Sequence, residues 1–488
     1  MHDTSPPVSS MTSAVRLRDS WRFTSGERLL LAIMLLAILV FGGVLERRTA
    51  LRNQPMTDLG VFACAARAVA TGVNLYSVGD WHGWHYHYPP LMAILMRPFA
   101  HPLPEPCPEL PPGVLRNTTN TPWGYELQGM ESQYCPLSAR NAHFFGIVAG
   151  WYLFSIALLL LAVHALACGL EGARLRDGLP PVGAVRRRWW LRRLMPMLIV
   201  VTSIGAELSR GQVDIVLLAA IAFALYFAVR GRHLAAGLCL IFPACVKLFP
   251  VLLGLWPLWR RHWAMLGGML AGATLGLIVI PALAIGPART VALYQEWVHV
   301  LLLPGLGASA DDTRDRELTE MNSTDNQSLL AFFHNWSNYG RTLEERGSHP
   351  AAPAARVAVA VSGALLLAAA CWAARWRRHE NARASYGFAG LLTGIMLLLS
   401  PVTHSFYLVL LIPLLMTLVD FCLDNRATPR LQLMLAAILG VFWVVDLTIR
   451  LVPRDGVVWS MGLPVLCVLM LLAAGAWLLR GDTAERVI

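Results

Sequence analysis

Charged residues are scarce in this chain of 488 residues: they make up only 14% of it, against 56% hydrophobic residues. Lysine is almost absent, because Lys247 is the only lysine among 40 basic residues. In a water-soluble protein, charged residues make up about a quarter of the chain and are spread over its surface. Here they gather between long apolar runs, as they do around helices that face lipid. The composition excludes a soluble multidomain protein.

Patterns that mark several other classes of protein are also missing. The arginines give a net charge of +10, yet they form no basic domain interleaved with aromatic residues, so we expect no nucleic-acid partner. No small-residue cleavage site follows the first apolar run, which indicates an uncleaved first span. No internal repeat is evident, which disfavours transporter folds built from duplicated halves. The basic residues are therefore interpreted as topology signals.

The nine cysteines show no zinc-ligand spacing, and most lie singly in or near apolar segments, where packing is their ordinary role. Cys107 and Cys135 differ, because both lie in a polar loop that we place outside the membrane. Oxidation there permits a disulfide between them, and two free thiols are the alternative.

Ten apolar segments are candidates for membrane-spanning helices, each of which needs about 20 apolar residues. They are residues 29–45, 144–167, 195–208, 213–229, 264–285, 357–374, 388–399, 406–419, 433–445 and 457–479. In residues 234–259, Pro243, Lys247 and Pro250 separate two short apolar pieces, which predicts a broken or re-entrant helical pair. The predicted fold is an all-α polytopic membrane protein with about 10 to 12 transmembrane helices.

Arginine clusters set the predicted orientation. One cluster precedes the first span and another, at residues 186–193, precedes the third. Because cytoplasmic loops are enriched in arginine, both termini are predicted to be cytoplasmic. The same orientation leaves two long extracytoplasmic loops, residues 46–143 and 304–356. Residues 1–28 are then a cytoplasmic basic leader, and residues 29–488 form a single membrane-embedded domain.

Asp58 lies just past the first span, before a stretch of helical spacing that ends at Thr71. Asp is a preferred residue at a helix start, so one interpretation is an N-cap. The other is a general base, because a carboxylate at the membrane surface can accept a proton from an acceptor hydroxyl. The two roles are compatible.

Aromatic and histidine residues alternate between Trp81 and Tyr88. Aromatic rings suit the level of the lipid headgroups and also stack on sugar faces. His82, His85 and His87 raise the alternative of a metal site, but their spacing matches no standard ligand set. We therefore predict an interfacial aromatic loop and no metal or cofactor.

Lys247 lies between two prolines, deep in apolar sequence. An ionisable group in such a place is costly and usually faces a cavity or a polar partner. Contact with a lipid phosphate is the functional interpretation, and simple snorkelling to the interface is the alternative.

Two short turns on the same predicted face carry further polar residues. One contains Arg210, Gln212 and Asp214, with Glu207 in the apolar run before it. An ordinary turn with an internal ion pair is the alternative to a binding role there. His404 lies in the other turn, where a satisfied interfacial histidine is the common outcome.

Taken in order, these motifs resemble the polyprenol-phosphate-mannose-dependent enzymes of glycosyltransferase family 87, which have the membrane glycosyltransferase C-type fold. The resemblance runs along most of the chain. It is carried by Asp58, residues 72–76 with Tyr88-Pro89-Pro90, Gly211-Gln212, Lys247 with Pro250, Asn326-Gln327-Ser328, and Ser400-Pro401 with His404.

The resemblance implies an inverting transfer of a hexose, usually mannose, from a polyprenyl-phosphate donor to a lipid or glycan acceptor, by an enzyme that is also in contact with membrane lipids. Asp58 is then the catalytic base on the outer face of the cell (inner) membrane. Lys247, Arg210 and His404 are expected at the donor phosphate, where fixed cations stabilise the charge of the leaving group. Tyr88, Gln212 and Asn326 are expected to bind substrate.

Two features depart from the family pattern, namely the insertion at residues 101–140 and Asp214, where an amide is usual. The insertion affects the expected choice of acceptor. A lipid or solute transporter is the alternative function, because intramembrane charge and broken helices occur there too. A non-catalytic subunit of a membrane assembly is a third, and it requires Asp58 to be replaceable.

Overall fold

The computed structural model describes residues 23–47, 57–77, 85–100, 142–175, 184–305, 326–342, 345–346, 351–375, 381–425, 427–448 and 462–481. The regular elements of these residues are all helices, and the one extended pairing among them is a single bridge between Asn326 and His404. Most of the basic leader lies outside the described residues, as do Cys107 and Cys135. Their disulfide stays a prediction.

Eight helical segments in the described part of the chain are long and apolar enough to cross a membrane. They are α2 (Ser25–Glu46), α5 (Ala142–Glu171), α11 to α12 (Trp263–Ile285), α18 (Pro353–Arg375), α19 (Ala382–Leu399), η8 with α20 (Ser405–Cys422), α21 (Pro429–Thr448) and α23 (Leu463–Gly481). Two shorter apolar helices accompany them, α8 (Asp214–Val229) and α9 (His233–Val246). The predicted all-helical polytopic membrane fold is confirmed.

The helix break predicted around Lys247 is present. Helix α9 contains Pro243 and ends at Val246, and Lys247 itself has extended backbone angles, φ −124° and ψ 133°. The short helices η5 (Phe249–Gly254) and α10 (Leu255–Arg260) follow. A proline inside a helix removes one backbone hydrogen bond and crowds the preceding turn. The break places the side chain of Lys247 at a point between two helical pieces.

The helices pack in two groups. In the first, α8 packs against α5 and α9, and α9 packs against α11 (Trp263–Ala273). In the second, α19 contacts α18, α20 and α23, and almost every residue along α19 is buried. Helix α6 (Ala184–Ile199) contacts α5 of the first group and α20 of the second, so it links the groups, and α7 (Val201–Arg210) contacts η8.

Glycines allow α9 and α11 to approach closely. A Cβ added to Gly268 would lie 2.2 Å from the backbone oxygen of Leu234, whereas a Cβ on its neighbour Gly267 would meet nothing within 4 Å. We expect Gly268→Ala to destabilise the protein by about 1–3 kcal/mol, because backbone atoms cannot move aside cheaply. Gly267→Ala is the matched control. Thermal unfolding in detergent should separate the two variants, and equal midpoints would contradict this packing.

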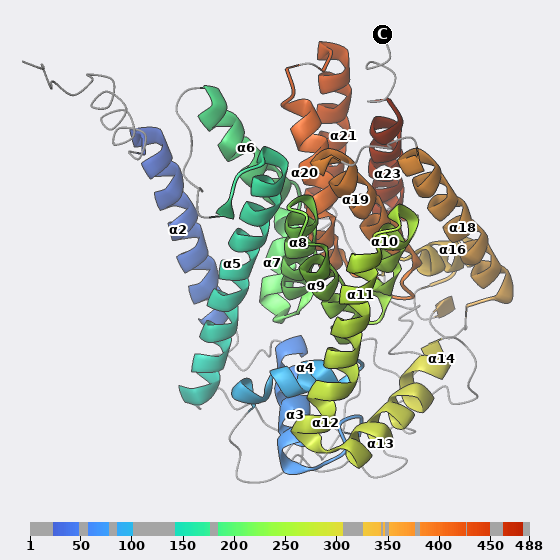
Figure 1. Ribbon diagram of the computed structural model, residues 1–488. Coiled ribbons are helices and arrows are strands. Elements are labelled where there is room, and N and C mark those ends of the chain that lie inside the picture. Colours follow the sequence, from blue (N-terminus) through green and yellow to red (C-terminus); the bar gives the residue numbers. More distant parts are fainter. Residues whose placement is uncertain are drawn as a thin grey trace, which may run out of the picture.

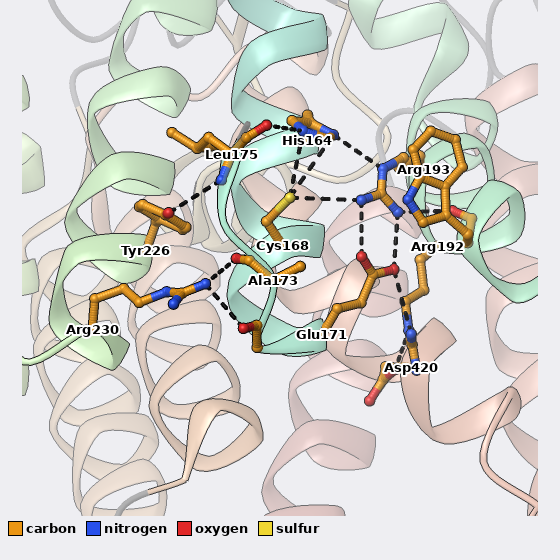
Figure 2. A network of polar contacts seen from close by, with 12 residues as sticks. His164, Cys168, Glu171, Ala173, Leu175, Arg192, Arg193, Tyr226, Arg230 and Asp420 are labelled. Carbon is orange, nitrogen blue, oxygen red and sulfur yellow. Dashed lines mark hydrogen bonds and ion pairs between the residues drawn. The ribbon is translucent and has the colours of Figure 1, made fainter. Parts of the chain in front are cut away.

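The two ends of the helical bundle differ in character. Helix α2 begins and α23 ends at the same end of the bundle as α6, while α3 (Thr57–Thr71), α4 (Pro90–Leu95), α12 (Ile280–Ile285) and α13 (Pro287–Trp297) gather at the other end (Figure 1). At the α6 end, Arg193 and Arg192 pair with Glu171 of α5, and Arg192 also pairs with Asp420 of α20 (Figure 2). The basic cluster thus ties three helices together.

Candidate active site

A cavity of about 710 Å³ lies where α3, the α7–α8 turn, the break after α9 and the turn after α19 meet. Six of the seven residues predicted for the site line it, although they are far apart in the sequence. They are Asp58, Tyr88, Arg210, Gln212, Lys247 and His404. The seventh, Asn326, is buried and is not among the lining residues. The fold therefore brings most of the predicted site together.

Asp58 lies in the first turn of α3 and forms an ion pair with Arg210, with 3.1 Å between Oδ2 and Nε. Both side chains remain partly exposed, at 24% for Asp58 and 37% for Arg210. The guanidinium of Arg210 also lies over the ring of Phe406, 4.9 Å from its centroid. The cavity thus contains a carboxylate and a guanidinium held beside each other, both within reach of a bound molecule.

Lys247 forms a buried cluster in the wall of the cavity. Its Nζ donates to both carboxylate oxygens of Asp214, at 2.9 and 3.0 Å, and to Oε1 of Gln212 at 3.2 Å. The ammonium also lies 4.2 Å from the ring centroid of Tyr407 and 5.3 Å from that of Tyr88. These three polar contacts equal the number of N–H groups that an ammonium can donate. The buried charge of Lys247 is therefore matched within the protein.

Glu207 of α7 supports this cluster from behind. Its Oε1 accepts hydrogen bonds from the backbone N–H groups of Asp214, at 2.6 Å, and Ile215, at 3.2 Å. It therefore caps the start of α8, where the first backbone N–H groups have no partner within the helix. Its other carboxylate oxygen is buried and has no hydrogen-bond partner. Glu207 fixes the position of Asp214 relative to α7.

The turn between α7 and α8 depends on Gly211, which has a φ of +70°. A Cβ at this position would lie 2.6 Å from the Cβ of Leu59, the residue that follows Asp58. The glycine therefore permits the close approach of α3 that brings Asp58 to Arg210.

Substitution of Gly211 by Ala should separate α3 from this turn. Gly231 has a similar φ of +72° and nothing within 4 Å of an added Cβ, so Gly231→Ala carries the same backbone strain without the contact. We expect Gly211→Ala to lose at least about tenfold more activity than Gly231→Ala, since a misplacement of about 1 Å can cost 100-fold. Comparable activities of the two purified variants would contradict this role.

Asn326 holds the turn that carries His404. Its amide donates to the carbonyl of Pro401 at 3.0 Å, and its Oδ1 accepts from the N–H of Thr403 at 3.0 Å. His404 stacks on Phe406 with a centroid distance of 4.9 Å. These contacts with backbone groups assign Asn326 a positioning role, and its contact with substrate stays a prediction.

The aromatic residues before α4 pack into the protein. The hydroxyl of Tyr76 donates to the carbonyl of Tyr88 at 3.1 Å, and that of Tyr86 to the carbonyl of Pro89 at 2.7 Å. Burial raises the pKa of Tyr88, although the nearby Lys247 and a hydrogen bond with Gln212 act in the opposite direction. Tyr88 is therefore a neutral hydrogen-bonding group in the cavity wall.

His85 and His87 also line the cavity, whereas His82 lies outside the described residues. Within the described ranges, no group of three or more His, Cys, Asp or Glu side chains could hold a metal ion.

One wall of the cavity, formed by α13, was not predicted from the sequence. Trp297 of α13 lines the cavity, and its Nε1 donates to the carbonyl of His87 at 3.4 Å. Glu296 accepts from the amide of Asn74 at 2.6 and 2.7 Å, and Arg289 donates to backbone carbonyls at the end of α3. Arg289 and Glu296 lie in an otherwise apolar region of the sequence, and these two charges were the pattern from which the wall could have been predicted. They fasten α13 to the segment that follows α3.

The family model described as Glycosyltransferase family 87 matches residues 86–401, which is more than half of the chain. No curated protein and no solved structure matches the chain. The matched region includes Tyr88, Arg210, Gln212 and Lys247. Asp58 precedes it and His404 follows it, yet both line the same cavity as the matched residues.

Proposed function

Because this chain belongs to glycosyltransferase family 87, we propose that it transfers a hexose, with mannose as the first candidate, from a polyprenyl-phosphate donor to an acceptor hydroxyl. The protein is a multi-pass membrane glycosyltransferase. The observation that supports the finer proposal is the convergence of Asp58, Arg210 and His404 on one largely apolar cavity. Such a cavity suits a donor with a charged headgroup and a lipid chain.

In the proposed reaction, the acceptor oxygen forms a bond to the anomeric carbon while the bond from that carbon to the phosphate oxygen breaks. Asp58 takes the proton of the acceptor hydroxyl, which makes the oxygen a better nucleophile. The electron pair of the broken bond leaves with the polyprenyl phosphate. Attack from the side opposite the leaving group inverts the anomeric configuration.

The leaving phosphate gains negative charge, so nearby donors and cations lower the barrier. Arg210 is the best-placed cation, because it is partly exposed in the cavity and a guanidinium matches phosphate geometry. His404 lines the same cavity. Direct contact between Lys247 and the phosphate would require the ammonium to leave Asp214, so we assign Lys247 to fixing Gln212, Tyr88 and Tyr407 in the wall.

We further place the site on the outer face of the cell membrane, with both termini in the cytoplasm. The arginines of α6 lie at the end of the bundle opposite α3, which supports this orientation. Labelling of single cysteines introduced at positions 58 and 187 tests it. Reaction of both from the same side would overturn it.

A transporter is the alternative, and its charged residues should follow a two-sided path through the bilayer. The candidate residues here share one cavity that adjoins α3. Purified protein in detergent distinguishes the two functions, because a micelle has no second compartment. We expect a new glycosidic bond to form from donor and acceptor under these conditions. A protein that carries labelled lipid across vesicles but forms no product in detergent would be a transporter.

A further inference from the structure

The wall of the cavity around Lys247 has two layers. Lys247 and Gln212 line the cavity directly, whereas Asp214 has 0% exposure and lies behind them. The carboxylate of Asp214 accepts hydrogen bonds from Lys247 at 2.9 and 3.0 Å. A buried carboxylate therefore opposes the positive charge of the ammonium from the side away from the cavity.

The proposed reaction changes the charge of the lipid that occupies the cavity. The donor is a phosphodiester with one negative charge. The product is a phosphomonoester, which carries up to about two negative charges near neutral pH, since its second pKa is about 6. An unopposed lysine in the wall would attract the product more strongly than the donor, and the product would leave slowly.

We propose that Asp214 is a positioning residue that holds Lys247 and cancels its charge toward the cavity, so that the polyprenyl phosphate product is released readily. This proposal rests on the proposed function, because it takes its two ligands from that reaction. The proposal follows from the geometry of the pair, because both carboxylate oxygens of Asp214 lie within hydrogen-bond distance of Nζ of Lys247. Glu207 holds Asp214 in place, since its Oε1 accepts from the backbone N–H of Asp214 at 2.6 Å. Asp214 thus touches neither ligand and acts through Lys247.

The test is Asp214→Asn, which keeps the size of the side chain and one oxygen that can accept from Lys247. In the variant, the ammonium loses the one carboxylate with which it forms an ion pair among the described residues and should recruit the phosphate. We expect the inhibition constant of polyprenyl monophosphate to fall about tenfold, equivalent to about 1.4 kcal/mol. The KM for the donor should fall less, and kcat should fall as product release slows. An unchanged or higher inhibition constant would overturn the proposal.

Two further variants separate this role from a general structural one. Asp420→Asn removes a buried carboxylate outside the cavity, which pairs with Arg192 and Arg383, and it should leave the inhibition constant unchanged. The double variant Asp214→Asn/Lys247→Met removes both charges and should return the constant to within about threefold of wild type. If polyprenyl monophosphate inhibited the double variant tenfold more weakly than the wild type, Lys247 would bind the product even while it is paired with Asp214. That result would contradict the proposal.

Failure of this inference is distinguishable from failure of the proposed function. If the wild-type enzyme transfers sugar but Asp214→Asn shows no tighter inhibition, the inference is wrong and the function stands. If the wild-type protein transfers no sugar from the polyprenyl-phosphate donor, the function itself is wrong. Polyprenol without the phosphate is the ligand control, and its inhibition should be the same for all variants.

Discussion

Replacement of Asp58 by Asn is expected to lower the rate of sugar transfer about 100-fold or more, while the protein folds and inserts normally. An acceptor hydroxyl is a poor nucleophile at neutral pH, and a carboxylate within hydrogen-bond reach removes its proton as the new bond forms. Asp58 lines the cavity and is partly exposed there. An asparagine side chain cannot take the proton. The single-turnover rate of the purified variant is the measurement.

The variant separates the two interpretations of Asp58. Asp58 is the second residue of α3, so a purely structural role would be the stabilisation of the helix start by its negative charge, worth about 0.3–1 kcal/mol, and a residue with that role alone would leave the transfer rate unchanged on substitution by Asn. The amide oxygen can also still accept from Arg210, which preserves the geometry of the pair. Asp58→Glu restores a carboxylate and should recover part of the activity. Transfer at the wild-type rate by Asp58→Asn would leave Asp58 with only a structural role in the first turn of α3 and would remove the proposed base.

Replacement of Lys247 by Met is expected to destabilise the protein by about 3–5 kcal/mol, because it leaves a buried carboxylate without its partner. Asp214 is completely buried, and Lys247 is the one cation within salt-bridge distance of it among the described residues. A methionine fills a similar volume but carries no charge. Thermal or denaturant unfolding of the purified variant in detergent measures the loss.

The double variant Lys247→Met/Asp214→Asn removes both charges and should recover most of that stability. The double variant also tests the contact between Lys247 and the donor phosphate that was predicted from the sequence. Direct contact of Lys247 with the donor phosphate predicts a loss of about 2–4 kcal/mol in donor binding that the second substitution cannot repair. An internal ion pair predicts a donor KM close to wild type. A double variant as unstable as Lys247→Met alone would contradict the pairing.

The sequence was sufficient to predict the class of fold and much of the site. Apolar runs of the length of a bilayer predict spanning helices, and Pro243 and Pro250 predict the break that places Lys247 beside the cavity. Asp58 and Arg210 were both identified from the sequence, but their ion pair was not. It depends on how α3 packs against the α7–α8 turn through Gly211, and local patterns do not specify that packing.

The counter-charge of Lys247 was the main feature that the sequence did not reveal. A lone lysine in apolar sequence indicates that some anion compensates it, but a bound phosphate and an internal carboxylate satisfy that requirement equally. Asp214 was considered only within its own turn, and its position 33 residues before Lys247 gave no sign that the two side chains meet. The wall formed by α13 was missed for a similar reason, since Glu296 meets Asn74 across 222 positions. Both contacts depend on tertiary packing.

The most direct test of the proposed function is the choice of donor by the purified protein. Polyprenyl-phosphate mannose and a nucleotide-linked mannose, each labelled in the sugar, would be supplied separately with a membrane extract as the source of acceptor. We expect transfer from the polyprenyl donor alone, with one polyprenyl phosphate released for each sugar transferred and a rate at least about 100-fold lower for Asp58→Asn. Transfer from the nucleotide donor, or release of lipid phosphate that Asp58→Asn leaves unchanged, would contradict it.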